Sequence, residues 1–283
     1  MIDYKVRCIR LNIEKIREEY IKQGYTRANS IAKVCQDIIL KEISKSSYFQ
    51  NVTIKGGVVM HSISNDKRRA TRDIDLDFIK YSLDNSSIIK FIDKLNDNED
   101  GIAIKIDGKI EKLHHQDYDG KRVNITINDS YNNIMTTKLD IGVHKNFDLE
   151  QDEYCFDLNA IDTTATLFVN SVEQIFLEKL KSLLKFGILS TRYKDIFDFY
   201  YLINNTNIDK DKFNKYIREI IYNDDSMEEK NIKDIIRKLK IIFSNKIFIR
   251  NLKDARNNWL EVPVEKVLNS IYMFLENLEK VTI

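Results

Sequence analysis

The sequence of 283 residues contains a single proline and only 8 glycines. Proline and glycine are the residues that most often end or weaken helices, so their scarcity predicts long uninterrupted helices. Hydrophobic residues make up 43% of the chain, which excludes an intrinsically disordered protein. At this length we expect one large domain or two modest ones, with a sizeable buried core.

Cysteine is scarce too, and its pattern argues against a structural metal or disulfide framework. The three cysteines, Cys8, Cys35 and Cys155, are odd in number, widely spaced and without a CxxC pair. We therefore expect reduced, buried thiols. The adjacent His114 and His115 lie in a polar stretch and lack the i, i+4 spacing of helical metal ligands, so we place them on the surface.

Long apolar runs are absent from the sequence. No stretch reaches the roughly 20 apolar residues that a membrane helix needs, and residues 1–5 carry no apolar core of the signal-peptide type. We therefore expect a cytoplasmic protein with no membrane association.

Neither sign of charge dominates, because the net charge is +1. Attraction to nucleic acid would have to come from a local patch. Residues 235–256 hold seven basic residues and one acid, a local charge of +6, with Phe243 and Phe248 interleaved and Trp259 close behind. Two interpretations stay open: a surface that follows nucleic-acid phosphates, or a solvated helix face whose aromatic side chains belong to the core.

The periodicity of apolar residues changes along the chain and defines the expected architecture. The expected strands are residues 51–54, 73–79, 102–106, 123–127, 136–143 and 154–158. The expected helices are residues 30–43, 58–60, 87–95, 172–186, 191–203, 210–222, 228–243 and 263–278. We therefore predict the α/β class in its mixed α+β form, with the sheet in residues 1–170 and a helical domain in residues 171–283.

An acidic strand is the first candidate site. Asp73 and Asp75 are two residues apart on a predicted strand, so their side chains leave the same face roughly 7 Å apart. Ile74 and Leu76 alternate with them and point into the core. A divalent cation relieves the repulsion between neighbouring carboxylates, and hard oxygen ligands favour Mg²⁺ or Ca²⁺. Taken alone, the pattern is equally typical of a solvated acidic face on an edge strand.

The context of this strand strengthens the functional interpretation. Gly56 and Gly57 follow a predicted strand and precede a helix, where backbone N–H groups can approach phosphates. Asp140 lies among apolar neighbours on another predicted strand, where an unpaired charge is costly. It is either a third metal carboxylate or the partner of a nearby lysine or arginine.

The predicted helix 172–186 contains two charged residues in unexpected places. Its apolar residues fill one broad arc, and Glu173 and Lys179 fall inside that arc. Buried charges of this kind often belong to functional sites. Lys179 could reach nucleotide phosphates as a point charge, with Glu173 orienting it or a nearby base. The alternatives are a structural Glu–Lys ion pair, or a lysine that extends past the edge of the core.

Several motifs between Lys55 and Asp198 resemble those of the AbiEii/AbiGii-type nucleotidyltransferase toxins, which belong to the DNA polymerase β-like superfamily. In the order of the family, they are Lys55-Gly56-Gly57, Arg69-x-Thr71-x-Asp73-Ile74-Asp75, Leu139-Asp140-Ile141-Gly142, Glu173 with Glu178-Lys179-Leu180, and Arg192-Tyr193-Lys194-Asp195. The regions before and after them add little to the resemblance.

The resemblance implies a nucleotidyltransferase-fold domain and a C-terminal helical bundle whose first two helices complete the active site. It implies transfer of NMP from an NTP, in some members onto the acceptor end of tRNA, and a companion antitoxin. The implied metal ligands, for two Mg²⁺ ions with Mn²⁺ as an alternative, are Asp73, Asp75 and Asp140. The implied catalytic residues are these three acids with Lys179 and Asp195. The implied nucleotide-binding residues are Lys55, Gly56, Gly57, Arg69, Thr71, Glu173 and Lys179.

One departure from the family pattern lies at the glycine turn. Many members carry a Ser or Thr there that can touch the triphosphate, whereas this chain has Val58. Backbone N–H groups would have to suffice, or Ser62 or Ser64 would substitute. Two other functions compete with transfer to tRNA: a nucleotidyltransferase that acts on a small molecule or a protein, and a catalytically silent module that binds nucleotides or RNA.

Overall fold

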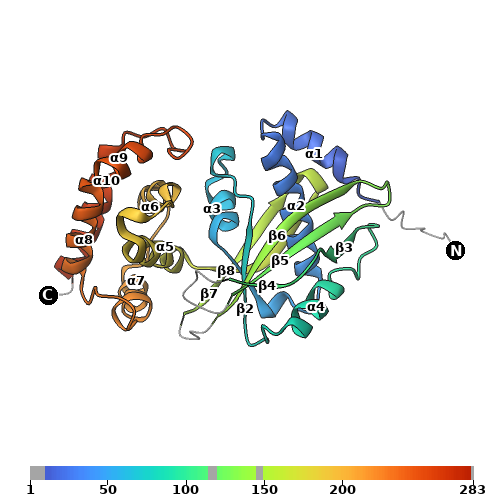
Figure 1. Cartoon of the computed structure of the whole chain (residues 1–283), viewed down its shortest axis with the longest axis horizontal. Helices are drawn as coiled ribbons and strands as arrows, with labels where there is room; N and C mark the ends of the chain where they lie inside the picture. The colour runs from blue at the N-terminus through green and yellow to red at the C-terminus, as the bar shows by residue number, and fades with distance from the viewer. Residues whose placement is uncertain (1–9, 114–119, 145–148, 282–283) are drawn as a thin grey trace. The chain divides into compact units, whose positions relative to one another are not determined.

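The computed structural model describes residues 10–113, 120–144 and 149–281, so Cys8, His114 and His115 lie outside the described residues. The chain divides into two compact units, Met1–Asn170 and Ser171–Ile283. Figure 1 shows strands and helices together in the first unit and helices α5 to α10 in the second.

The first unit is built on a mixed eight-stranded sheet with the order β3-β5-β6-β2-β1-β8-β7, in which β4 also pairs with β5. The strands are β1 (Val52–Lys55), β2 (Ile74–Phe78), β3 (Ala103–Ile106), β4 (Glu111–Leu113), β5 (Gly120–Asn128), β6 (Ile134–Val143), β7 (Gln151–Leu158) and β8 (Thr163–Asn170).

Strand β2 lies in the interior of the sheet. It pairs with β1 in antiparallel fashion and with β6 in parallel fashion. Its alternate residues Ile74, Leu76 and Phe78 are fully buried, as the period of two predicts. The interpretation of this segment as an acidic edge strand is therefore wrong.

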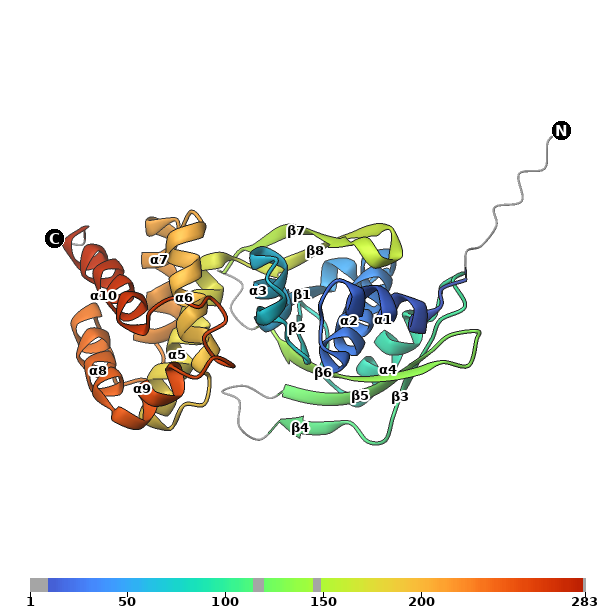
Figure 2. The ribbon, with the colours of Figure 1, turned by 90° about the horizontal axis from the view of Figure 1, so that it is seen from above.

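Four helices cover the sheet: α1 (Ile13–Lys22), α2 (Arg27–Lys45), α3 (Gly56–Ser64) and α4 (Asn85–Lys94). Thr26 caps the start of α2 by accepting a hydrogen bond from the N–H of Asn29. Helix α2 packs on α1 and on strands β6 and β8. In Figure 2, α1 and α2 lie between the β7–β8 pair and the β5–β6 pair, so the twisted sheet curves around them.

The second unit is helical throughout its described residues. It contains α5 (Val172–Phe186), α6 (Tyr193–Asn205), α7 (Lys210–Ile217), a short π-helical turn (Arg218–Tyr222), α8 (Ile232–Ser244), α9 (Lys246–Leu252) and α10 (Val264–Val281). Ser171 caps α5 by accepting a hydrogen bond from the N–H of Gln174. Phe176 stacks against Phe199, Phe213 and Phe274, which joins four helices around one aromatic core.

The predicted mixed α/β class is confirmed, and the predicted helix at residues 172–186 coincides with α5. The prediction of buried thiols holds for Cys35 and is wrong for Cys155, which is exposed. Cys155 lies on β7 and alternates with the buried Phe156, so it takes the solvent side of the strand. Among the described residues, no helix is long and apolar enough to cross a membrane.

Candidate active site

The glycine turn joins β1 to α3, and both glycines are required by close contacts. Gly56 has a φ of +68°, in the left-handed region that favours glycine. A Cβ on Gly56 would collide with the Asp75 carboxylate, and a Cβ on Gly57 would lie 2.7 Å from both Cβ and Oγ1 of Thr71. Lys55, at the N-cap of α3, makes no side-chain capping bond. The start of α3 therefore meets the acidic strand with its N–H groups uncapped by that side chain.

Four charged residues form a row across four neighbouring strands. Lys55 pairs in register with Asp75, Asp75 with Asp140, and Asp140 with Arg122. Register partners in a sheet point to the same face. The row therefore reads cation, acid, acid, cation across β1, β2, β6 and β5, and Asp73 lies two residues before Asp75.

The two central acids differ in surroundings from Asp73. Asp73 is exposed, Asp75 is half-buried and Asp140 is buried. Their carboxylate oxygens are the hard donors that Mg²⁺ and Mn²⁺ prefer. Among the described residues, however, no group of three or more His, Cys, Asp or Glu side chains is arranged to hold a metal ion.

Asp140 is bound by Arg122. The guanidinium donates from Nε to Oδ1 at 2.8 Å and from Nη2 to Oδ2 at 2.7 Å. Hydrogen bonding to Asp140 raises the pKa of Arg122, and the nearby charge of Asp73 acts in the same direction. The structure thus gives Asp140 the arginine partner that the sequence left as an alternative to a metal. The donor types fit a divalent ion, provided that Arg122 shares Asp140 with it.

Lys55 is committed to a buried ion pair at the other end of the row. Its Nζ lies 2.6 Å from Oδ1 of Asp77, and the two side chains are 9% and 7% exposed. Asp77 was not selected as a site residue from the sequence. It continues the alternation of acids after Asp73 and Asp75, and its burial is visible only in the structure. This ion pair joins β1 to β2 and neutralises the buried charge of Asp77.

The segment between the glycine turn and the acids is fixed by α2. The buried Gln36 donates from Nε2 to the carbonyl of Thr71 at 2.9 Å.

The pKa of the buried His61 is lowered to about 4. Desolvation is the largest cause, followed by the charge of Lys33 and then by that of the buried Arg69. His61 accepts or donates a 3.0 Å hydrogen bond with the hydroxyl of Tyr25.

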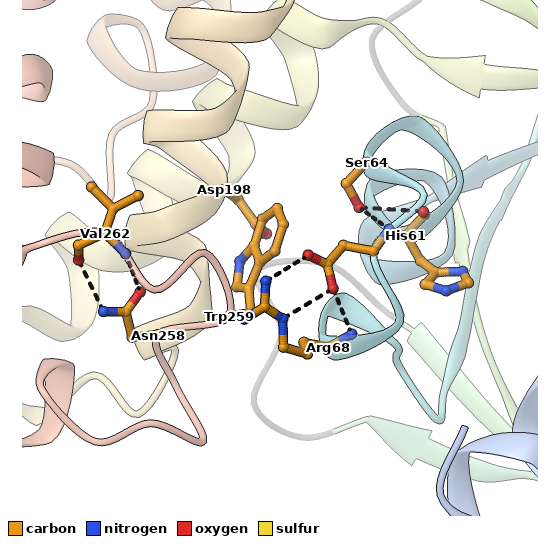
Figure 3. Close-up of polar contacts among 8 residues, drawn as sticks. His61, Ser64, Arg68, Asp198, Asn258, Trp259 and Val262 are labelled. Carbon is orange, nitrogen blue, oxygen red and sulfur yellow. Dashed lines mark hydrogen bonds and ion pairs between the residues drawn. The ribbon is translucent and has the colours of Figure 1, made fainter. Parts of the chain in front are cut away.

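Ser64 does not replace the missing hydroxyl at the glycine turn. It lies at the last residue of α3, with Gly56 at the first. Figure 3 shows its Oγ between the carbonyl of His61, to which it donates at 3.3 Å, and the N–H of Asp66, from which it accepts at 3.4 Å. The carboxylate of Asp66 accepts hydrogen bonds from Nε and Nη2 of Arg68. The hydroxyl of Thr71 lies against the glycine turn.

In the second unit, Lys179 is held between two carboxylates. Its Nζ lies 2.5 Å from Oδ1 of Asp195 and 3.0 Å from Oδ2 of Asp198. Trp259 donates its indole N–H to Asp198 at 3.1 Å (Figure 3). All four residues are buried. The predicted residues Lys179 and Asp195 are thus brought together, and Asp198 and Trp259 join them.

Glu173 contacts Asp209 and Lys212, whereas Lys179 was the partner considered from the sequence. Its carboxylate accepts a 2.9 Å hydrogen bond from the N–H of Asp209 and lies 3.8 Å from Nζ of Lys212. It therefore fixes the start of α7, while the ammonium of Lys179 is held by Asp195 and Asp198.

The basic segment 235–256 has less unbalanced positive charge in the structure than its sequence indicates. Acids pair with four of its cations, namely Arg237, Lys238, Lys253 and Arg256. Phe243, Phe248 and Trp259 are buried. For these aromatic residues, the interpretation as core side chains is confirmed.

Comparison with known proteins agrees with the resemblance in the motifs. One solved structure that matches is that of an antigenic nucleotidyltransferase-like protein from Paracoccidioides brasiliensis, at 15% identity and a TM-score of 0.42, over 78% of this chain and 92% of that chain. A search of the curated proteins finds no match. Residues 38–264 match the family described as "Nucleotidyl transferase AbiEii toxin, Type IV TA system". The match extends over most of the sequence and includes every candidate site residue, and the chain therefore belongs to the AbiEii family of nucleotidyltransferase toxins.

Proposed function

We propose that this toxin transfers NMP from an NTP to an acceptor hydroxyl, with the 3′ end of tRNA as the first candidate, in a reaction that depends on Mg²⁺ or Mn²⁺. The observation that carries the proposal is the row in which Asp75 and Asp140 are register partners beside the glycine turn. The family supplies the class of reaction; the acceptor and the metal are part of the proposal.

The chain's own residues have separate tasks in the proposed reaction. The N–H groups at the start of α3 bind phosphate oxygens of the NTP, because the positive end of a helix favours anions. Thr71 supplies a hydroxyl beside this turn. Gln36 positions Thr71 by donating a hydrogen bond to the backbone carbonyl of Thr71. Divalent ions held by Asp73, Asp75 and Asp140 would supply charge stabilisation of the triphosphate when bound.

The covalent step balances without a further reactant. The acceptor oxygen bonds to the α-phosphorus, the bond from this phosphorus to the bridging oxygen of the β-phosphate breaks, and pyrophosphate leaves. A carboxylate oxygen of the acidic row accepts the proton of the acceptor hydroxyl. The resemblance assigns Lys179 and Asp195 to the same chemistry.

The test is transfer of label from each α-³²P NTP into total RNA, a protein mixture and small hydroxyl compounds. We expect label in RNA of tRNA size, lost when divalent ions are chelated. Asp75→Ala should reduce transfer by at least about 100-fold, whereas Asp93→Ala, which removes an exposed acid of the same unit, should leave it unchanged.

Each other outcome names a different function. Label in protein or in a small compound would replace tRNA as the acceptor. Binding of NTP without release of pyrophosphate would identify a silent binding module. Full transfer by Asp75→Ala would refute the proposed site.

A further inference from the structure

Asp140, one of the three carboxylates predicted to hold a metal ion, is bound through both of its oxygens by a cation of the protein. Both oxygens of Asp140 accept hydrogen bonds from the guanidinium of Arg122, at 2.8 and 2.7 Å. This two-point arrangement is the strongest that a carboxylate and an arginine can form. The Asp140 side chain is 8% exposed, so water cannot easily compete for it.

The arrangement follows from the register of the sheet. Arg122 on β5 is the register partner of Asp140 on β6, and Asp140 is the register partner of Asp75 on β2. The guanidinium therefore reaches Asp140 from the side opposite to Asp75. The cation at the other end of the row, Lys55, is directed to Asp77. Arg122 is thus the cation of the row that binds both oxygens of Asp140, a predicted metal ligand.

We propose that Arg122 is a positioning residue that occupies Asp140 in the resting enzyme, and that Asp140 exchanges this guanidinium for the divalent ion when the active site assembles. The proposal rests on the metal dependence proposed above. It means that Asp140 joins the other two candidate carboxylates, the exposed Asp73 and the half-buried Asp75, as a metal ligand only after Arg122 has released it.

A functional consequence follows from this competition. With Asp140 engaged, the free protein binds a divalent ion weakly, because each lost carboxylate removes a hard anionic ligand. Phosphate oxygens of an NTP supply further hard ligands, so the ion enters together with the nucleotide. Arg122 also stabilises the metal-free protein, since an unpaired buried Asp140 would be costly.

The alternative is that Arg122 is a structural partner whose positive charge weakens metal binding only from a distance. The two explanations differ in one measurable way. If Arg122 acts by occupying Asp140, removing Arg122 changes the affinity for the divalent ion only in a protein whose residue 140 is still an aspartate that can bind the ion. A double-variant cycle between Arg122 and Asp140 therefore separates them.

The test measures Mn²⁺ binding to the full chain without nucleotide, from the loss of the EPR signal of free Mn²⁺. We expect Arg122→Ala to tighten Mn²⁺ binding by about fivefold, the size of one partly exposed ion pair. Arg122→Lys, which keeps the charge and loses the two-point geometry, should give a smaller gain. The gain should vanish in the Asp140→Asn background. Lys121→Ala is the matched control, because it removes a neighbouring cation of β5 that binds Asn85 instead.

A second measurement follows the thermal unfolding of EDTA-treated protein. Arg122→Ala should lower Tm, and Mn²⁺ should recover more of this loss than it adds to the wild type. If Arg122→Ala fails to fold, Arg122→Lys and Arg122→Gln provide the same comparison.

Three results would overturn the inference: unchanged Mn²⁺ affinity in Arg122→Ala, an equal gain in the Asp140→Asn background, or an equal gain in Lys121→Ala. With any of these, metal-dependent transfer by the wild type would leave the proposed function standing. Absence of Asp75-dependent Mn²⁺ binding in the wild type, together with absence of transfer, would overturn both.

Discussion

At the scale of single residues, Gly57 and Thr71 depend on each other. The Cα of Gly57 lies so close to Thr71 that an added Cβ would be 2.7 Å from its Cβ and Oγ1. The side chain of Val58, which follows, cannot donate to a phosphate. Thr71, from the connection between α3 and β2, is the residue that we propose supplies a hydroxyl beside the triphosphate, and its position requires a glycine opposite it.

We expect Gly57→Ala to reduce nucleotide transfer by about tenfold or more and to lower the free energy of unfolding by about 1–3 kcal/mol, as overpacking does. Label transfer and urea unfolding measure the two effects. Adding Thr71→Gly should restore most of the stability, because it removes the three atoms nearest to the new Cβ, which are Cβ, Oγ1 and Cγ2 of Thr71. Stability that stays low in the double variant would place the strain elsewhere.

The scale of elements shows what the sequence could and could not predict. Strand β2 and helix α5 were predictable, because their apolar periods are strict and Ser171 marks the start of α5. The predicted helix 210–222 coincides with α7 and the π-helical turn Arg218–Tyr222 that continues it, a change of helix type that periodicity does not show. The predicted helix 228–243 starts only at Ile232, which Asn231 caps.

Other elements escaped for identifiable physical reasons. Helix α9 was not expected. It is short, and the same residue, Asn245, ends α8 and caps the start of α9, so no separate loop marks the boundary between the two helices. Helix α1 and strands β4 and β8 were not expected from their patterns. Above all, sequence periodicity contains no register. The pairing of Arg122 with Asp140 depends on register between β5 and β6, and so no motif could reveal it.

Lys179 illustrates how a helix positions a buried charge. Placement of Lys179 on the inner side of α5 was predictable from its helical angle, and the residue is buried. Its partners Asp195 and Asp198 both come from α6. A structural ion-pair network and a lysine prepared for nucleotide phosphate have the same resting geometry, so a functional measurement has to separate them.

Lys179→Met should lower the free energy of unfolding by about 3–5 kcal/mol, because Asp195 and Asp198 would be left buried without their cation. If Lys179 also acts on the nucleotide, transfer per folded molecule should fall by about 100-fold, as for other lost electrostatic groups. Lys181→Met is the matched control, since it breaks a different ion pair of α5, with Asp224. Label transfer well below Tm separates the two contributions: unchanged transfer by folded Lys179→Met would make Lys179 purely structural.

At the scale of the whole molecule, His61 makes stability depend on pH. Burial is the largest cause that lowers its pKa to about 4, followed by the charges of Lys33 and Arg69. In the unfolded chain the imidazole has its ordinary pKa of about 6.5. The unfolded state therefore binds a proton in a range of pH where the folded state does not.

The sign of the effect follows from this difference. The stability associated with neutral His61 is complete above pH 6.5 and is lost as the pH falls towards 4, in total about 3 kcal/mol. His61→Gln keeps a polar group near the hydroxyl of Tyr25 and cannot titrate. We expect it to flatten the fall of the free energy of unfolding between pH 6.5 and 4, measured by urea unfolding at a series of pH values. Carboxylates that titrate in the same range are common to both proteins, so the difference between the two curves isolates His61; parallel curves would show that its protonation is not linked to folding.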